Sequence, residues 1–178
     1  RDLREANYQK VAGVCRNTDS KMHWQGVFLR LPKSASRAKF ADHRTYKYKG
    51  GEIDRQVHMG IDLASVARSP IPAANTGIVI FAEFLGIYGK TVIMDHGFGL
   101  FSMYAHLSHI GVKVGDQLAK GDILGRTGIT GLAGGDHLHF SMLIHDTFVN
   151  PVEWWDPNWI KHNVSAKIER TATGVKQE

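Results

Sequence analysis

Strand-like runs punctuated by glycine follow one another along most of this chain, and no long helical pattern separates them. These runs recur roughly every 8–15 residues. A parallel pair of strands needs a crossover of about a dozen residues or more, usually a helix. Because no helical pattern of that length lies between the runs, we expect a mostly antiparallel β domain. The expected strands are GVFLRLP (26–32), TGIVIFAEF (76–84), KTVIMDH (90–96), LFSMYAHL (100–107), DILGRT (122–127) and HLHFSMLI (137–144).

A further pair of strands is expected in YKYKGGEIDRQVH (46–58), where the residues alternate on both sides of Gly50 and Gly51. Two glycines between alternating runs favour a two-residue hairpin turn. This hairpin adds to the antiparallel pattern of the chain.

Helix signals are strongest near the C-terminus. The pairs Asn150-Pro151 and Asp156-Pro157 each place an N-capping side chain before a proline at the first helical position. After the second pair, apolar residues spaced by four predict a short amphipathic helix that ends near Arg170. These apolar residues are Ile160, Val164 and Ile168. The tryptophans expected to cover the core from these C-terminal helices are Trp154, Trp155 and Trp159.

The pattern divides the chain into three parts. Residues 1–25 are polar and lack a strong apolar stripe, so we expect a linker or the end of a helix from a preceding part of the protein. Residues 26–170 form the expected domain, and residues 171–178 the expected flexible tail. The chain begins without an apolar leader or an initiator Met, so we expect any export signal or membrane anchor to lie upstream.

Charge and cysteine content narrow the classes of partner and metal ligand. The net charge of +5 suits an anionic partner such as a nucleic acid, a membrane surface or an anionic cell-wall polymer, and it also fits an ordinary soluble basic protein. The basic residues are scattered, and no aromatic RNA-binding signature accompanies the densest run at 37–49, so we expect no nucleic-acid partner. Cys15 is the single cysteine, which leaves histidines and carboxylates as ligands for any zinc site.

Two short motifs contain candidate metal ligands. In GDHLHFSM, His137 and His139 are one residue apart on an expected strand, so both side chains point to the same face. In HMGID, His58 and Asp62 lie four residues apart, which is about 13 Å in a fully extended strand. The chain must bend between them if both bind one metal ion, and Gly60 tolerates such a bend.

A third motif, SMYAHLS, adds one further histidine. Strand alternation predicts that Tyr104 and His106 share one face, with Met103 and Ala105 on the other. Each motif alone is weak, but together they place four histidines and one carboxylate on separate β-segments of one small domain.

These motifs resemble, in order along the chain, those of the LytM/lysostaphin-type zinc metallopeptidases, which cut the peptide part of peptidoglycan. The resemblance runs from about residue 54 to residue 151. It is carried by HMGID (58–62), PIPAANTGIV (70–79), YGKTVIMDHGFGLFSMYAHLS (88–108), KVGDQLAKGDILGRTGITG (113–131) and HLHF (137–140).

The resemblance implies a role for each of the five residues. By position in the family's motifs, His58, Asp62 and His139 would bind Zn²⁺, and His106 and His137 would be catalytic residues that do not bind the metal. Two imidazoles and one carboxylate fill three of four tetrahedral positions and leave one for water. The implied activity is a zinc endopeptidase that hydrolyses stem peptides or cross-bridges of peptidoglycan, on an antiparallel β-sheet groove.

Several features leave alternatives open. The stretch TGITGLAGGDHLHFS carries extra residues, with Asp136 before the histidine pair, and Ser141 stands where the family often has Glu. The polar stretch 33–50 could fold over the groove and block it. A non-catalytic LytM-like module that binds the wall or activates another hydrolase is the alternative function. Either function implies a periplasmic or cell-surface location.

The other histidines lack a partner at a useful spacing, or lie only near the motifs. Those expected to be ordinary are His23, His43, His145 and His162. His96 and His109 lie next to the motif strands in the sequence, so they are the better candidates to orient a ligand.

Overall fold

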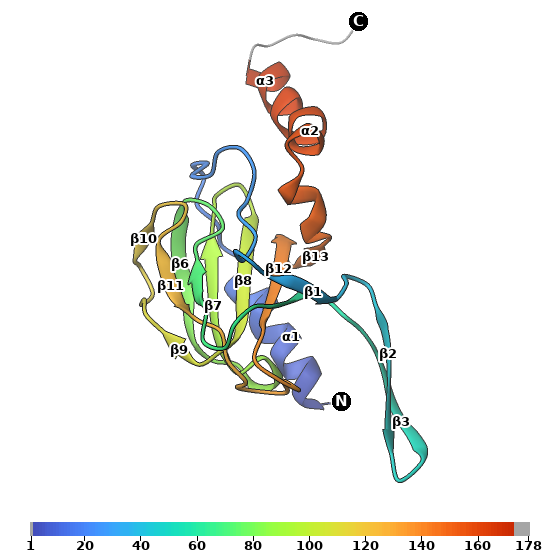
Figure 1. Cartoon of the computed structure of the whole chain (residues 1–178). Helices are drawn as coiled ribbons and strands as arrows, with labels where there is room; N and C mark the ends of the chain where they lie inside the picture. The colour runs from blue at the N-terminus through green and yellow to red at the C-terminus, as the bar shows by residue number, and fades with distance from the viewer. Residues whose placement is uncertain (1, 173–178) are drawn as a thin grey trace, which may run out of the picture.

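The computed structural model describes residues 2–172 and, within them, contains a large antiparallel sheet, a small sheet and a separate hairpin (Figure 1). All the strand pairs of the large sheet are antiparallel, so the predicted fold class is confirmed. Its order is β1 (Ala35–Ala38), β4 (Ile61–Ala64), β12 (Leu138–Ile144), β8 (Leu100–Leu107), β7 (Lys90–Asp95), β6 (Gly77–Phe84) and β10 (Gln117–Leu118), with β13 (Thr147–Val149) paired to β12.

The smaller β elements complete the fold. The hairpin of β2 (His43–Tyr48) and β3 (Gly51–Val57) forms as the sequence predicts and extends away from the large sheet (Figure 1). Its two-residue turn is Lys49-Gly50, one residue before the predicted Gly50-Gly51, because Gly51 already pairs with Tyr48. The small sheet consists of β5 (Pro70–Pro72), β11 (Ile123–Arg126) and β9 (His109–Ile110).

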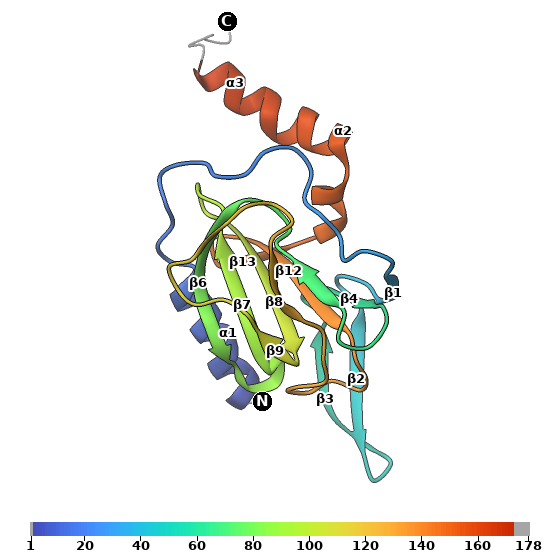
Figure 2. The same cartoon turned by 60° about the vertical axis from the view of Figure 1, so that its left-hand side comes forward.

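One face of the large sheet is covered by an N-terminal helix, α1 (Asp2–Val14), which runs behind β6, β7 and β8 in Figure 2. Val11 of this helix and the following Cys15 are buried in one cluster with Phe81 and Met103. Burial raises the pKa of the Cys15 thiol to about 12. The helix is thus held by tertiary contacts, although its own sequence has only a weak apolar stripe. The expected domain boundaries stay a prediction.

The opposite face of the sheet carries the larger core. There the backbone N–H of Ala74 donates a hydrogen bond of 2.8 Å to the Tyr104 hydroxyl. The Trp154 ring packs edge-on against the rings of Trp24 and Phe28, with centroids 5.8 and 5.6 Å away. The expectation that the C-terminal tryptophans cover the core is confirmed by the packing of Trp154, Trp155 and Trp159 in this cluster.

Most of the expected strands form, but the strand predicted at 26–32 does not. Its apolar side chains Phe28 and Leu31 are buried in the core as an irregular segment. The N–H of Phe28 bonds to the carbonyl of Trp154, whereas the N–H of Leu29 bonds to the carbonyl of Ala74. Because these bonds go to two different parts of the chain, no strand ladder develops.

The C-terminal helices begin at the predicted caps. Asn150 accepts a hydrogen bond from the N–H of Val152, and Asp156 accepts one from the N–H of Asn158. The helical segments are η2 (Pro151–Trp155), α2 (Pro157–Ile160), the π-helical η3 (Lys161–Ser165) and α3 (Ala166–Ala172). Residues 173–178 of the expected tail lie outside the described residues. Among residues 2–172, the helices are too short or too polar to cross a membrane.

Candidate metal centre and active site

The HMGID segment bends as the sequence requires and brings His58 and Asp62 together. Strand β4 starts directly after Gly60, where a Cβ atom would lie 2.6 Å from both the Phe140 carbonyl oxygen and the Ser141 hydroxyl. Only glycine therefore lets the bend pack against β12. Asp62 is opposite His139 in the pairing of β4 with β12, and the HxxxD and HxH motifs meet at this point.

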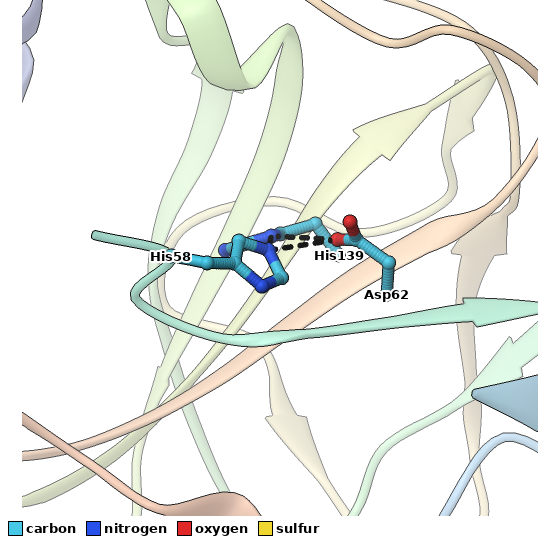
Figure 3. Close-up of side chains that lie close together, drawn as sticks. All are labelled: His58, Asp62 and His139. Carbon is cyan, nitrogen blue, oxygen red and sulfur yellow. Dashed lines mark hydrogen bonds and ion pairs between the residues drawn. The ribbon is translucent and has the colours of Figure 1, made fainter. Parts of the chain in front are cut away.

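The three predicted ligands converge on one point (Figure 3). Their donor atoms all lie within 4.8 Å of one another. Asp62 Oδ1 is 3.0 Å from His58 Nε2 and 3.1 Å from His139 Nδ1, and these two ring nitrogens are 3.0 Å apart. Three N and O donors around a common centre match the ligand set of a catalytic zinc site.

The hydrogen bonds of the outer ring nitrogens fix the tautomer of both imidazoles. His58 Nδ1 donates to the carbonyl oxygen of Lys39 at 2.8 Å, so its Nε2 presents a lone pair. The Ser141 hydroxyl donates its proton to the Met59 carbonyl, so it must accept from His139 Nε2 at 3.0 Å. His139 Nδ1 therefore also presents a lone pair, and the donor set fits a metal ion.

Electrostatics favour the ligand forms of Asp62 and His139. Burial alone would raise the pKa of the Asp62 carboxyl, but the contacts with His137, His139 and His58 hold it well below its usual range. Burial lowers the pKa of the His139 imidazole, despite the opposing effect of the Asp62 carboxylate. An ionised carboxylate and a neutral imidazole are the forms that bind metal.

His106 reaches the same centre through a break in the strand pattern. The register between β7 and β8 shifts between Lys90 and Val92, and His106 has a positive φ of 63°. The alternation prediction that His106 shares a face with Tyr104 is therefore wrong, because this bulge turns its ring to the opposite face. There the ring centroid is 4.8 Å from that of His137 and 5.9 Å from that of His139.

The pKa values of the two histidines outside the ligand set are shifted in opposite directions. Burial, followed by the nearby charge of His139, lowers the pKa of His106 to about 4. Burial also acts to lower the pKa of His137, but the contact of its Nε2 with Asp62 Oδ1 at 3.5 Å outweighs burial and raises it. His106 Nδ1 donates to the Thr130 carbonyl at 2.8 Å, which leaves Nε2 as a proton acceptor.

A cleft of about 610 Å³ opens beside the centre. Its walls come from α1, from the β2–β3 hairpin, from the short helix η1 (Gly86–Tyr88) and from the loop at residue 132. His58, His106 and His139 line it. The polar stretch 33–50 thus contributes one wall of the cleft through β2 and leaves these three histidines at the surface of the cleft.

Sequence reasoning missed several partners of the site. Arg44 Nη2 donates to Asp62 Oδ2 at 2.8 Å, although the two residues are 18 positions apart. The carbonyl groups of Lys39 and Thr130 orient two histidine rings, and backbone carbonyls leave no signal in a sequence. Ser141 did leave one, because it stands in the HLHFS motif where the family often has Glu.

The two histidines expected near the ligands differ in their surroundings. His96 is buried and bonds to the Thr76 carbonyl and the Ser102 hydroxyl, so the suggestion that it orients a ligand is wrong. His109 lies exposed on β9. The Asp136 carboxylate accepts hydrogen bonds from the Thr127 hydroxyl and the Arg68 N–H, so it holds the loop before the HxH motif.

Comparison with known proteins places this geometry in a family. The model of "Peptidase family M23" matches residues 56–151. The peptidoglycan DD-endopeptidase ShyA of Vibrio cholerae is 31% identical over 96 residues, which cover 54% of this chain and 22% of that protein. The chain spans less than a third of the length of the curated relatives that it matches.

Solved structures have the same fold. A structure described as a peptidase M23 from Pseudomonas aeruginosa has 30% identity and a TM-score of 0.70, and the match covers 85% of this chain and 60% of that one. The catalytic domain of lysostaphin from Staphylococcus simulans has 25% identity and a TM-score of 0.60, with coverage of 72% and 96%. Because the family model covers more than half of the chain, this chain belongs to peptidase family M23, and the resemblance to LytM/lysostaphin-type peptidases is confirmed.

Proposed function

We propose that the chain is the catalytic domain of a zinc endopeptidase that hydrolyses peptide bonds in peptidoglycan stem peptides or cross-bridges. The observation that carries this proposal is the convergence of His58, Asp62 and His139, with His106 and His137 beside them. Membership of family M23 and the similarity to ShyA, described as a peptidoglycan DD-endopeptidase, support the substrate class. A location in the periplasm or at the cell surface follows from that substrate.

His58, Asp62 and His139 would hold the zinc ion through Nε2, a carboxylate oxygen and Nδ1. When bound, zinc supplies Lewis-acid chemistry that polarises a peptide carbonyl and lowers the pKa of water. The carbonyl of Lys39 and the hydroxyl of Ser141 keep the two ligand rings in the tautomer that the ion requires.

His106 and His137 supply the proton transfers that amide hydrolysis needs. The attacking water must lose a proton, the developing oxyanion needs a hydrogen-bond donor, and the leaving amine must gain a proton. Both histidines direct Nδ1 to a backbone carbonyl, of Thr130 and of Gly135, and so keep Nε2 for the reaction. A module that only holds metal for structure or binds the wall has no use for this pair, which favours catalysis.

The first experiment measures zinc content and peptidase activity together. Wild type is expected to bind one zinc ion per chain and to release new peptide ends from isolated peptidoglycan. His139→Ala should lose both. His137→Ala should keep the metal and lose about 100-fold or more in turnover, the usual contribution of a general acid or base.

The two variants separate the proposal from its alternative. Full turnover by His137→Ala would overturn the catalytic role given to that residue. Zinc in the wild type without any cleavage of peptidoglycan would favour the non-catalytic module. A folded wild type that binds no zinc would overturn the proposal itself.

A further inference from the structure

The two oxygens of the Asp62 carboxylate have different partners. Oδ1 faces the convergence point, at 3.0 Å from His58 Nε2 and 3.1 Å from His139 Nδ1. Oδ2 instead accepts a hydrogen bond of 2.8 Å from Arg44 Nη2. One oxygen of the carboxylate thus faces the metal position, and the other bonds to one arginine.

Arg44 comes from a part of the chain outside the segment that the family model matches, residues 56–151. It lies on β2, where it pairs with Gln56 of β3, so the hairpin fixes its backbone. Two residues further along β2, the guanidinium of Arg4 from α1 lies 4.8 Å from the centre of the Tyr46 ring. The hairpin that carries Arg44 is therefore also in contact with α1.

Stability does not explain this contact well. The side chains of Arg44 and Asp62 are 36% and 13% exposed. An ion pair with an exposed member contributes only about 0–1 kcal/mol to folding. Geometry is a better explanation, because the planar guanidinium is a rigid donor that holds a carboxylate oxygen in one direction.

We propose that Arg44 is a positioning residue that restricts Asp62 to metal coordination through one oxygen. This inference rests on the proposed metal centre. With Oδ2 held by Arg44, three protein donors leave a fourth tetrahedral position open, as a catalytic site requires. Without Arg44, Oδ2 is free to turn towards the ion as a second carboxylate donor, so that with water in the fourth position the coordination number rises from four to five.

Cobalt(II) provides a readout of coordination number that does not depend on turnover. Its visible absorption is strong in four-coordinate sites and severalfold weaker in five-coordinate sites. Metal-free protein is loaded with one equivalent of Co²⁺, and the visible spectrum is compared for wild type, Arg44→Met, Arg44→Gln and Arg44→Lys. The Met and Gln variants are expected to lose absorption severalfold, because neither brings a charged donor to Oδ2. Arg44→Lys, which retains a charged donor but not the planar guanidinium, should give a spectrum between those of the wild type and Arg44→Met.

The matched control is Arg55→Met, on the partner strand of the same hairpin. Arg55 lines the same cleft but pairs with Glu52 at 2.6 Å, so its loss should leave the cobalt spectrum unchanged. Circular dichroism identifies any variant that does not fold. If Arg44→Met does not fold, the cobalt spectrum of Arg44→Gln is compared with that of the wild type instead.

The outcomes distinguish this inference from the proposed function. A wild-type spectrum in folded Arg44→Met or Arg44→Gln would overturn the role of Arg44 alone. An equal loss of absorption in Arg55→Met would also overturn it, because the effect would then belong to the hairpin as a whole. A wild type that takes up no cobalt would overturn the metal centre and this inference together.

Discussion

A single hydroxyl decides which nitrogen of His139 is available to a metal. Ser141 has one proton, which it donates to the Met59 carbonyl, so its oxygen can only accept from His139 Nε2. A glutamate at this position, frequent in the family, would place a negative charge at the outer nitrogen of His139, in addition to the Asp62 carboxylate at Nδ1. Serine fixes the same tautomer without that charge.

His96 makes the stability of the fold depend on pH. Burial lowers the pKa of its imidazole to about 4 from the ordinary value of 6.5, against a smaller opposing effect of the Thr76 carbonyl. Above pH 6.5 both the folded and the unfolded chain hold it neutral. As the pH falls from 6.5 to about 4, only the unfolded chain binds the proton, so stability decreases by about 3 kcal/mol.

The test is urea unfolding of metal-free wild type and His96→Gln above pH 6.5 and near pH 4. EDTA removes any metal-linked titration of the other histidines from the comparison. The wild type should lose more unfolding free energy than the variant by about 3 kcal/mol. Equal losses in both proteins would show that His96 does not contribute to the pH dependence.

Among the elements, β8 shows the limit of what side-chain alternation can predict from the sequence. Its residues are all buried. Alternation correctly places Tyr104 in the core on one face of the sheet and Met103 in the core on the other face. The bulge at His106 depends on the register with β7, which is set by pairing between strands and not by the composition of β8. The same limit applies to Arg44, which approaches Asp62 only after the hairpin and β4 have formed.

The loop before β12 supports His106 through a close glycine contact. Gly131 has a φ of 73°, and a Cβ there would lie 2.4 Å from the Gly89 nitrogen. Gly89 follows the short helix η1 (Gly86–Tyr88). This contact holds the adjacent Thr130, whose carbonyl accepts from His106 Nδ1. Thr130 and Gly131 thus have a structural role in this loop.

Gly131→Ala should therefore reduce both stability and turnover. A positive φ in alanine together with the backbone clash is expected to cost about 2–4 kcal/mol. Turnover should fall by about 10-fold or more, because His106 loses its orienting carbonyl. Zinc content should be unchanged, since none of the three predicted ligands lies in this loop.

The control is Gly134→Ala in the same loop. A Cβ at Gly134 meets nothing within 4 Å, so its effect on unfolding free energy should stay within about 0.5 kcal/mol. Thermal unfolding, metal content and peptidoglycan digestion are measured for both variants. Similar behaviour of the two would mean that the packing of Gly131 on Gly89 is not what holds the loop.

At the scale of the whole molecule, α1 is connected to the site although it precedes the segment that the family model matches. The Asn7 side chain accepts from the Ile87 N–H at 2.9 Å, and the Ile87 carbonyl accepts from the Leu132 N–H at 2.7 Å. Helix, η1 and loop thus form a continuous support behind His106. The sequence gives little sign of this, because the buried face of α1 is narrow and its partners lie about 80 residues away.

Val11→Ala tests whether α1 belongs to the folding unit. Val11 is 1% exposed in the core beneath the sheet. Loss of its buried methyl groups, partly offset by the higher helix propensity of alanine, should reduce the unfolding free energy by about 1–2 kcal/mol. Gln9→Ala, on the exposed side of the helix, should change it by less than about 0.5 kcal/mol.

Calorimetry and urea unfolding of the two variants discriminate the interpretations. If α1 is part of the domain core, Val11→Ala lowers the midpoint of the transition that unfolds the sheet. If residues 1–25 behave as a linker, as the sequence suggests, both variants keep the wild-type midpoint. We expect the first result, because the cluster of Val11, Cys15, Phe81 and Met103 joins helix and sheet in one buried core whose parts cannot unfold separately without exposing it.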